Sequence, residues 1–189
     1  MIGVVGGGQL AKLLVIAGKK RAVDVVVQTI SKLDPAAAVA SEVVLSDPTN
    51  VEGTKLLAKK CSSITFENEW VDIASLMTLQ NEGVSFFPKI ESITPLINKI
   101  SQRELLNRLD IPCPEWMPLP KNKSSSFFLP KEWSFPVMAK ASSGGYDGKG
   151  TKIIKDSKQL EELIAVNNDE KWFVERWVSY EKELSIVAT

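Results

Sequence analysis

The chain has 189 residues, which is enough for one large globular domain or two small ones. Lysine plus arginine and aspartate plus glutamate both number 23, and the balance holds locally, with nine basic against ten acidic residues through Pro95. This even charge excludes the electrostatic signature of nucleic-acid binding and of binding to an anionic membrane surface. We therefore expect a protein that acts on small molecules.

Histidine is absent, and the only cysteines are Cys61 and Cys113. This composition excludes Ser-His-Asp and Cys-His nucleophile systems and the common zinc ligand sets, so any chemistry must use carboxylates, lysines, backbone amides and hydrated metal. Two distant cysteines indicate free thiols in a reducing compartment. No apolar stretch approaches the roughly 20 residues of a membrane span, and the chain begins in an ordered element without a signal peptide. These features predict a cytoplasmic protein.

The first part of the chain alternates short β-branched runs with longer amphipathic runs, which is typical of a parallel α/β sheet. Strands are predicted over residues 2–5, 23–29, 43–45, 63–66 and 84–87. Helices are predicted over residues 9–18, 49–60 and 73–80, the last with Asp72 as its N-cap. We expect this α/β domain to cover residues 1–92.

After Pro88 the pattern changes to that of an α+β fold, expected over residues 93–189. Helices are predicted over residues 99–109 and 158–166, the second capped by Ser157, and strands over residues 137–141, 151–155, 172–178 and 183–188. Prolines make residues 111–118 extended, and residues 121–126 read as a polar loop. The chain stops inside an apolar strand, so we expect a fragment of a longer protein.

A glycine run, Gly6-Gly7-Gly8-Gln9-Leu10-Ala11, lies between the first predicted strand and the first predicted helix. Glycines let the backbone approach a ligand, and a helix N-terminus offers amides to an anion. A dinucleotide site would need an acidic residue at the end of the second strand, where the sequence has Gln28-Thr29. The run therefore favours the phosphate of another ligand, and a purely structural tight turn is the alternative.

Two carboxylates, Glu67 and Glu69, follow the fourth predicted strand. They are expected at the carboxyl edge of the sheet, near the glycine run. The alternative is that they are solvated loop acids or charges at a helix N-terminus.

The most informative segment runs from Pro136 to Gly150 and reads Pro-Val-Met-Ala-Lys-Ala-Ser-Ser-Gly-Gly-Tyr-Asp-Gly-Lys-Gly. Lys140 ends a predicted strand, and the glycine-rich loop after it could fold over a polyphosphate. It is not a Walker loop, because no Gly-Lys-Ser/Thr triplet opens a helix there. A plain hairpin turn is the alternative, since Asp147-Gly148 is a strong turn signal.

These segments, together with Glu-Arg-Trp-Val at residues 175–178 and Glu-Lys-Glu-Leu-Ser at 181–185, resemble the ATP-grasp family. More narrowly, they are similar to the 5-(carboxyamino)imidazole ribonucleotide synthases, the ATPase subunits of phosphoribosylaminoimidazole carboxylase in purine biosynthesis. Gly-Gly-Tyr-Asp-Gly-Lys-Gly is the most specific segment. The resemblance implies a Rossmann-like pre-ATP-grasp domain followed by an incomplete ATP-grasp domain.

In that family ATP and bicarbonate are thought to form carboxyphosphate, whose carboxyl group is captured by the amine of aminoimidazole ribonucleotide, leaving ADP and phosphate. The resemblance implies contacts of Gly8, Gln9 and Leu10 with the ribonucleotide phosphate, of Glu67 with its ribose, and of Tyr146 and Asp147 with its imidazole. For ATP it implies the set Lys99, Lys140, Gly145, Tyr146, Asp147, Gly148, Lys149, Gly150, Thr151, Glu175, Arg176, Trp177, Val178 and Glu183, with Lys140, Tyr146 and Asp147 as the catalytic residues.

Two departures from the family pattern stand out. Lys99 occupies a position where arginine is common, which keeps the charge and loses the planar fork. The residues that bind Mg²⁺ and bicarbonate in the family lie beyond Thr189, so little activity is expected of this chain alone. The family also implies a homodimer. The alternatives are another ATP-grasp ligase, such as the formate-dependent glycinamide ribonucleotide transformylase, a non-catalytic nucleotide-binding fragment, and, most distantly, a dinucleotide-dependent oxidoreductase.

Overall fold

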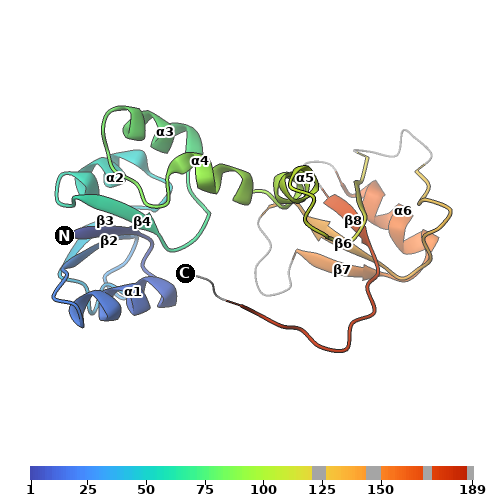
Figure 1. The fold of residues 1–189 in the computed structure, drawn as a ribbon, viewed down its shortest axis with the longest axis horizontal. Coiled ribbons are helices and arrows are strands. Elements are labelled where there is room, and N and C mark those ends of the chain that lie inside the picture. The colour runs from blue at the N-terminus through green and yellow to red at the C-terminus, as the bar shows by residue number, and fades with distance from the viewer. Residues whose placement is uncertain (121–126, 144–149, 168–171, 187–189) are drawn as a thin grey trace. The chain divides into compact units, whose positions relative to one another are not determined.

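The structure is a computed structural model that describes residues 1–120, 127–143, 150–167 and 172–186. The chain divides into two compact units, Met1–Ile97 and Asn98–Thr189, which we call the first and second unit. Figure 1 shows the elements of each unit. Among the described residues, no helix is long and apolar enough to cross a lipid bilayer.

The first unit is built on a parallel sheet of four strands in the order β3-β2-β1-β4. The strands are β1 (Ile2–Val5), β2 (Val25–Thr29), β3 (Glu42–Leu45) and β4 (Ser63–Phe66). The predicted fifth strand at residues 84–87 is wrong, because this segment makes only a single parallel bridge between Ile64 and Phe86. Pro88 follows at once and has no N–H to continue a ladder.

Helices cover both faces of this sheet (Figure 1). The helices are α1 (Gln9–Lys19), α2 (Val51–Ala58), α3 (Ile73–Asn81) and α4 (Ile90–Ile93), followed by the 3₁₀ turn η1 (Thr94–Leu96). Side chains alternate along each strand, so Val4 packs with α1 while Val5 packs with α2 and α3. Asp72 caps α3 as predicted, and α2 begins later than predicted because Asn50 caps it.

The second unit contains an antiparallel sheet in the order β5-β8-β6-β7. Its elements are α5 (Lys99–Arg108), β5 (Trp116–Pro118), β6 (Val137–Ala141), β7 (Thr151–Ile154), α6 (Ser157–Ala165) and β8 (Trp172–Arg176). Asp156 caps α6, one residue before the predicted cap, because its carboxylate accepts the N–H of Gln159.

Two predictions about the last part of the chain are corrected by the structure. The strand β8 ends at Arg176 instead of residue 178. Residues 183–186, predicted to begin another strand, are irregular, and the side chains of Leu184 and Ile186 are 91% and 92% exposed. A strand needs a hydrogen-bonded neighbour, and within the described residues none lies beside this segment.

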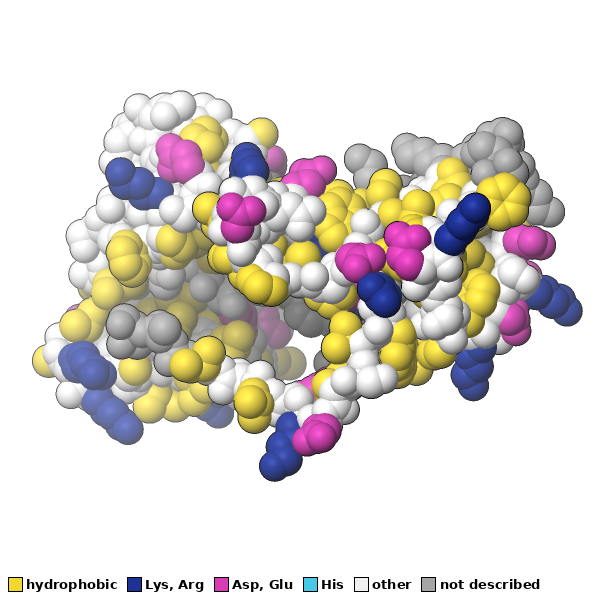
Figure 2. Space-filling model, turned by 45° about the vertical axis from the view of Figure 1, so that its right-hand side comes forward, with side chains coloured by type: hydrophobic (Ala, Val, Ile, Leu, Met, Phe, Trp, Pro, Cys, Tyr) yellow, Lys and Arg dark blue, Asp and Glu magenta, His cyan; other side chains and the backbone are white. Residues whose placement is uncertain are grey.

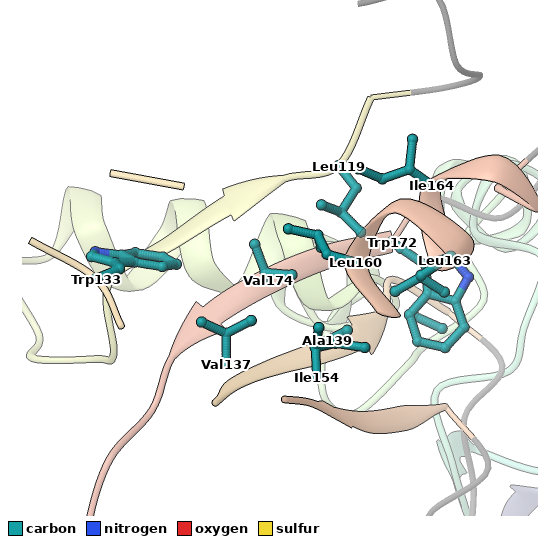
Figure 3. Close-up of a cluster of buried hydrophobic side chains, with 11 residues drawn as sticks. Leu119, Trp133, Val137, Ala139, Ile154, Leu160, Leu163, Ile164, Trp172 and Val174 are labelled. Carbon is teal, nitrogen blue, oxygen red and sulfur yellow. The ribbon is translucent and has the colours of Figure 1, made fainter. Parts of the chain in front are cut away.

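The core of the second unit lies between α6 and one face of the sheet (Figure 3). Leu160, Leu163 and Ile164 of α6 pack on Val137 and Val174 of the two central strands. The opposite face of these strands carries Met138, Lys140 and Glu175 instead. The α/β and α+β classes predicted for the two parts of the chain are thus confirmed.

Charged side chains of both signs are interspersed over the face of the molecule that Figure 2 shows. This distribution agrees with the balanced sequence, and the described residues on that face form no concentrated basic surface.

Candidate nucleotide and phosphate sites

In the first unit, the glycine run and Glu67 meet at the carboxyl edge of the sheet. Strands β1 and β4 are neighbours with Val5 opposite Phe66, so the residues that follow them lie side by side. The Glu67 carboxylate accepts the N–H of Gly8 through Oε2 at 2.7 Å and the N–H of Ala11 through Oε1 at 3.3 Å. Glu67 therefore caps the N-terminus of α1 from another strand, while Gly8 itself supplies no side-chain cap.

Close packing explains the glycines. A Cβ on Gly8 would lie 2.4 Å from a carboxylate oxygen of Glu67, and a Cβ on Gly7 would lie 2.1 Å from the Thr29 hydroxyl oxygen. These contacts support the alternative that the glycine run is a structural tight turn. It does not exclude a ligand, because Gln9 and Leu10 are exposed at the start of α1 and each carboxylate oxygen can accept more than one hydrogen bond.

Gln28 stands where a dinucleotide site would need an acid, and its side chain is fully buried. Its Nε2 donates to the carbonyls of Asp47 at 2.7 Å and Asn50 at 3.2 Å, and its Oε1 accepts the Thr54 hydroxyl at 2.9 Å. These contacts join β2 to the start of α2. The Gln28 side chain thus serves the fold and is not directed at a ligand.

In the second unit, two cations converge on one buried carboxylate. Glu175 has a side chain 3% exposed, and its Oε2 lies 2.6 Å from Nζ of Lys140. Its Oε1 is contacted by Nε and Nη2 of Arg103. We call these three residues the cation-carboxylate cluster. Sequence reasoning singled out Lys140 and Glu175 and missed Arg103.

The register of the sheet brings Lys140 and Glu175 together. Glu175 lies opposite Met138, and Lys140 is two residues further along β6, so both side chains point to the face that α6 does not cover. Lys140 also pairs with Thr151 on β7, and the Ala141 N–H donates to the Gly150 carbonyl at 2.8 Å.

Arg103 reaches the cluster from α5. Asn98 caps this helix, and the Lys99 N–H donates to the Ser142 carbonyl at 2.8 Å, which ties the helix start to the end of β6. Lys99 and Arg103 are four residues apart and therefore share one face of α5. This spacing is the signal that could have identified Arg103 from the sequence.

The remaining predicted nucleotide residues are spread over different surroundings. Arg176 alternates with Glu175, so it faces the opposite side of the sheet and pairs with Glu115 at 2.9 Å. Trp177 and Val178 are exposed after β8. Glu183 accepts the Tyr180 hydroxyl at 3.1 Å, which raises the pKa of that phenol.

Several predicted residues cannot be placed. Those of the glycine-rich loop, Gly145, Tyr146, Asp147, Gly148 and Lys149, lie outside the described residues. The loop's end is described, with Gly150 buried and Thr151 exposed at the start of β7. In the described part of the chain, no three side chains of the types Asp, Glu, His or Cys gather as a metal site.

Family models match both units. Residues 1–96 match the ribonucleotide synthetase preATP-grasp domain, which is more than half of the chain. The chain belongs to this family. Residues 104–189 match the ATP-grasp domain, so the preATP-grasp unit is followed by ATP-grasp sequence in the order that the motifs implied.

Named relatives align with almost the whole length of this chain. An N5-carboxyaminoimidazole ribonucleotide synthase of Synechocystis is 40% identical over 98% of this chain and 46% of the relative. The crystal structure of the Thermotoga maritima N5-carboxyaminoimidazole ribonucleotide synthetase is 31% identical, with a TM-score of 0.77 over 95% of this chain and 46% of that one.

An Aspergillus clavatus synthase, solved with ADP and 5-aminoimidazole ribonucleotide, is 26% identical with a TM-score of 0.81, covering 95% of this chain and 47% of that one. The chain thus spans about half the length of each of these three relatives.

Proposed function

We propose that this chain belongs to an enzyme that carboxylates 5-aminoimidazole ribonucleotide with bicarbonate at the expense of ATP, in purine biosynthesis. The products would be 5-(carboxyamino)imidazole ribonucleotide, ADP and phosphate. The first unit would hold the ribonucleotide and the second unit the ATP. The names of the relatives and the ligands of the Aspergillus structure support this proposal.

The observation that carries the proposal is the cation-carboxylate cluster, on the face of the second unit's sheet that α6 does not cover. Lys140 is the penultimate residue of β6, its ammonium group lies at Glu175, and its side chain is 26% exposed. A lysine so placed, four residues before the glycine-rich sequence that begins at Gly144, suits the binding of phosphate oxygens as a point charge. Phosphoryl transfer needs positioning and charge neutralisation more than covalent chemistry, so a site without histidine is adequate.

For the nucleotide we propose phosphate contacts by Lys99, Lys140 and residues 145–151. Glu175 and Val178 would contact the adenine through their backbone groups, and Glu183 would contact the ribose. The Lys99 and Lys140 backbones lie on α5 and β6, which the hydrogen bond to Ser142 ties together. Rigid elements of this kind fix the two backbone positions from which the lysine side chains extend.

For the ribonucleotide we propose that Gly8, Gln9 and Leu10 meet the phosphate and Glu67 meets the ribose. Tyr146 and Asp147 would border the imidazole and, with Lys140, act on the reacting groups. The position of Glu67 at the start of α1 supports this arrangement, because it places a carboxylate for hydroxyl groups beside a helix N-terminus for a phosphate.

The proposed reaction has two steps. A bicarbonate oxygen attacks the γ-phosphorus of ATP, the bond to the β-phosphate oxygen breaks, and ADP leaves carboxyphosphate behind. The ribonucleotide amine then attacks the carboxyl carbon, phosphate leaves, and the amine loses a proton. Lysine charges would stabilise the transferring phosphoryl group, and exclusion of water from the site would protect the intermediate from hydrolysis.

Mg²⁺ is the usual companion of ATP in such reactions, where it neutralises phosphate charge. Among the described residues, no three side chains of the types His, Cys, Asp or Glu gather to hold it. We also propose a cytoplasmic location and a homodimer. Sedimentation of the complete protein would test the homodimer.

The test is ADP release with ATP, Mg²⁺ and bicarbonate, with and without aminoimidazole ribonucleotide. It compares this chain with the protein translated from its full reading frame. We expect stimulation by the ribonucleotide in the full protein and none in the 189-residue chain. K140M should abolish the stimulation, whereas K152M, which changes a lysine of β7 that lies over the Trp172 ring, should retain it. Stimulation by glycinamide ribonucleotide with formate instead would refute the substrate assignment.

A further inference from the structure

We propose that Arg103 is a positioning residue for nucleotide binding. It neutralises the buried Glu175 carboxylate, so that Lys140 can leave this carboxylate and contact the phosphates of ATP. The inference rests on the proposed function, because it takes Lys140 as a phosphate ligand.

Each oxygen of the Glu175 carboxylate has its own cation. Arg103 contacts Oε1 through two nitrogens, Nε and Nη2, and Lys140 contacts Oε2 through Nζ at 2.6 Å. The side-chain exposures are 3% for Glu175, 19% for Arg103 and 26% for Lys140. Lys140 is therefore the member of the cluster with the most access to a ligand in solvent.

A buried carboxylate without a cation is strongly unfavourable. With Lys140 alone as its partner, Glu175 would hold the ammonium group and oppose its transfer to a phosphate. With Arg103 present, the carboxylate keeps the hydrogen bond from Nε, the ion-pair contact with Nη2 and a positive charge after Lys140 has left. Arg103 thereby lowers the cost of freeing Lys140.

The two cations differ in ways that suit these roles. The guanidinium group is planar, always charged and matched to a carboxylate, whereas the lysine ammonium is a compact charge on a flexible stem. The helix that carries Arg103 is held at its start, since Asn98 accepts the N–H of Ile100 at 2.8 Å and the Lys99 N–H donates to Ser142. These properties suit Arg103 to stay at Glu175 and Lys140 to move to a phosphate.

This division of roles predicts a rescue that a merely structural ion pair would not give. R103Q removes the charge but leaves a side chain that can donate a hydrogen bond. In this variant Lys140 supplies the positive charge beside the Glu175 carboxylate. When Lys140 moves to the phosphates of ATP, the buried carboxylate loses that charge. Adding E175Q removes the buried charge and frees Lys140 again. The double variant should therefore bind ATP more tightly than R103Q alone.

The experiment measures the Kd for ATP by calorimetry, and the KM values for ATP and for aminoimidazole ribonucleotide, on the protein translated from the full reading frame. The variants are R103Q, R103K, E175Q and R103Q/E175Q. The matched control is R108Q, which changes an exposed arginine in the last turn of the same helix. Melting temperatures verify that each variant is folded.

We expect R103Q to weaken ATP binding about tenfold or more, the range of a charge-assisted hydrogen bond, with the ribonucleotide KM unchanged. R103Q/E175Q should return to within about threefold of the wild type. R103K keeps a charge and loses the planar fork, so it should raise the KM for ATP by a smaller factor than R103Q. If R103Q does not fold, the KM of R103K for ATP tests the role of Arg103.

Equal ATP affinity of R103Q and R108Q would overturn the inference, as would a double variant no better than R103Q, or R103K with an unchanged KM for ATP. Absence of ATP binding in the wild-type protein would overturn the proposed function as well. The two failures are therefore distinguishable.

Discussion

The contact between Glu67 and the start of α1 makes a quantitative prediction about the first unit. E67A removes a carboxylate that accepts the N–H groups of Gly8 and Ala11 at 2.7 and 3.3 Å. Loss of a helix N-cap costs about 0.5–2 kcal/mol. Loss of a negative charge at the positive end of the helix dipole adds roughly 0.3–1 kcal/mol. We therefore expect E67A to lower the free energy of unfolding of the first unit by about 1–3 kcal/mol.

The assay is urea unfolding followed by far-ultraviolet circular dichroism, together with amide hydrogen exchange of Gly8 and Ala11. The matched control is E69A, which removes the same charge from an exposed side chain two residues away. E67Q keeps a carbonyl oxygen and loses the charge, so its effect should be intermediate. If E67A and E69A unfold at the same urea concentration, or if exchange at Gly8 is unchanged in E67A, the assignment of Glu67 as a cap is refuted.

Three further predictions concern other parts of the first unit. Q28L should cost about 2–4 kcal/mol in urea unfolding, because it removes three hydrogen bonds made by a buried side chain, to the Asp47 and Asn50 carbonyls and from the Thr54 hydroxyl. Hydrogen bonds from the Ser75 side chain and N–H lower the pKa of Asp72, so its contribution to stability is present above the ordinary carboxyl range and is lost as pH falls through the lowered value. D72N keeps the cap without the titration, and its stability relative to wild type should improve in acid. Burial raises the pKa of the Cys61 thiol, so iodoacetamide should modify this residue more slowly at pH 8 in the folded chain than in urea, as peptide mass spectrometry would measure.

Much of the local structure follows from the sequence alone. Short β-branched runs such as Val25–Thr29 form the strands, and helix caps such as Asp72 act where their chemistry places them. The missing acid at Gln28 argued against a dinucleotide, and the buried, fully hydrogen-bonded Gln28 supports that interpretation. These features depend on neighbouring residues in the chain, so their signals lie within a short window.

The tertiary structure decided which distant residues meet. Residues 84–87 have the composition of a strand but make one bridge, and residues 183–186 form no strand in the described part of the chain, because pairing needs a partner that a local pattern cannot show. Glu67 as the cap of α1 depends on β1 and β4 being neighbours. Arg103 at Glu175 depends on how α5 lies against β8, across 72 positions of sequence. Composition and spacing thus determined the chemical groups available, and packing determined which cation neutralises which carboxylate.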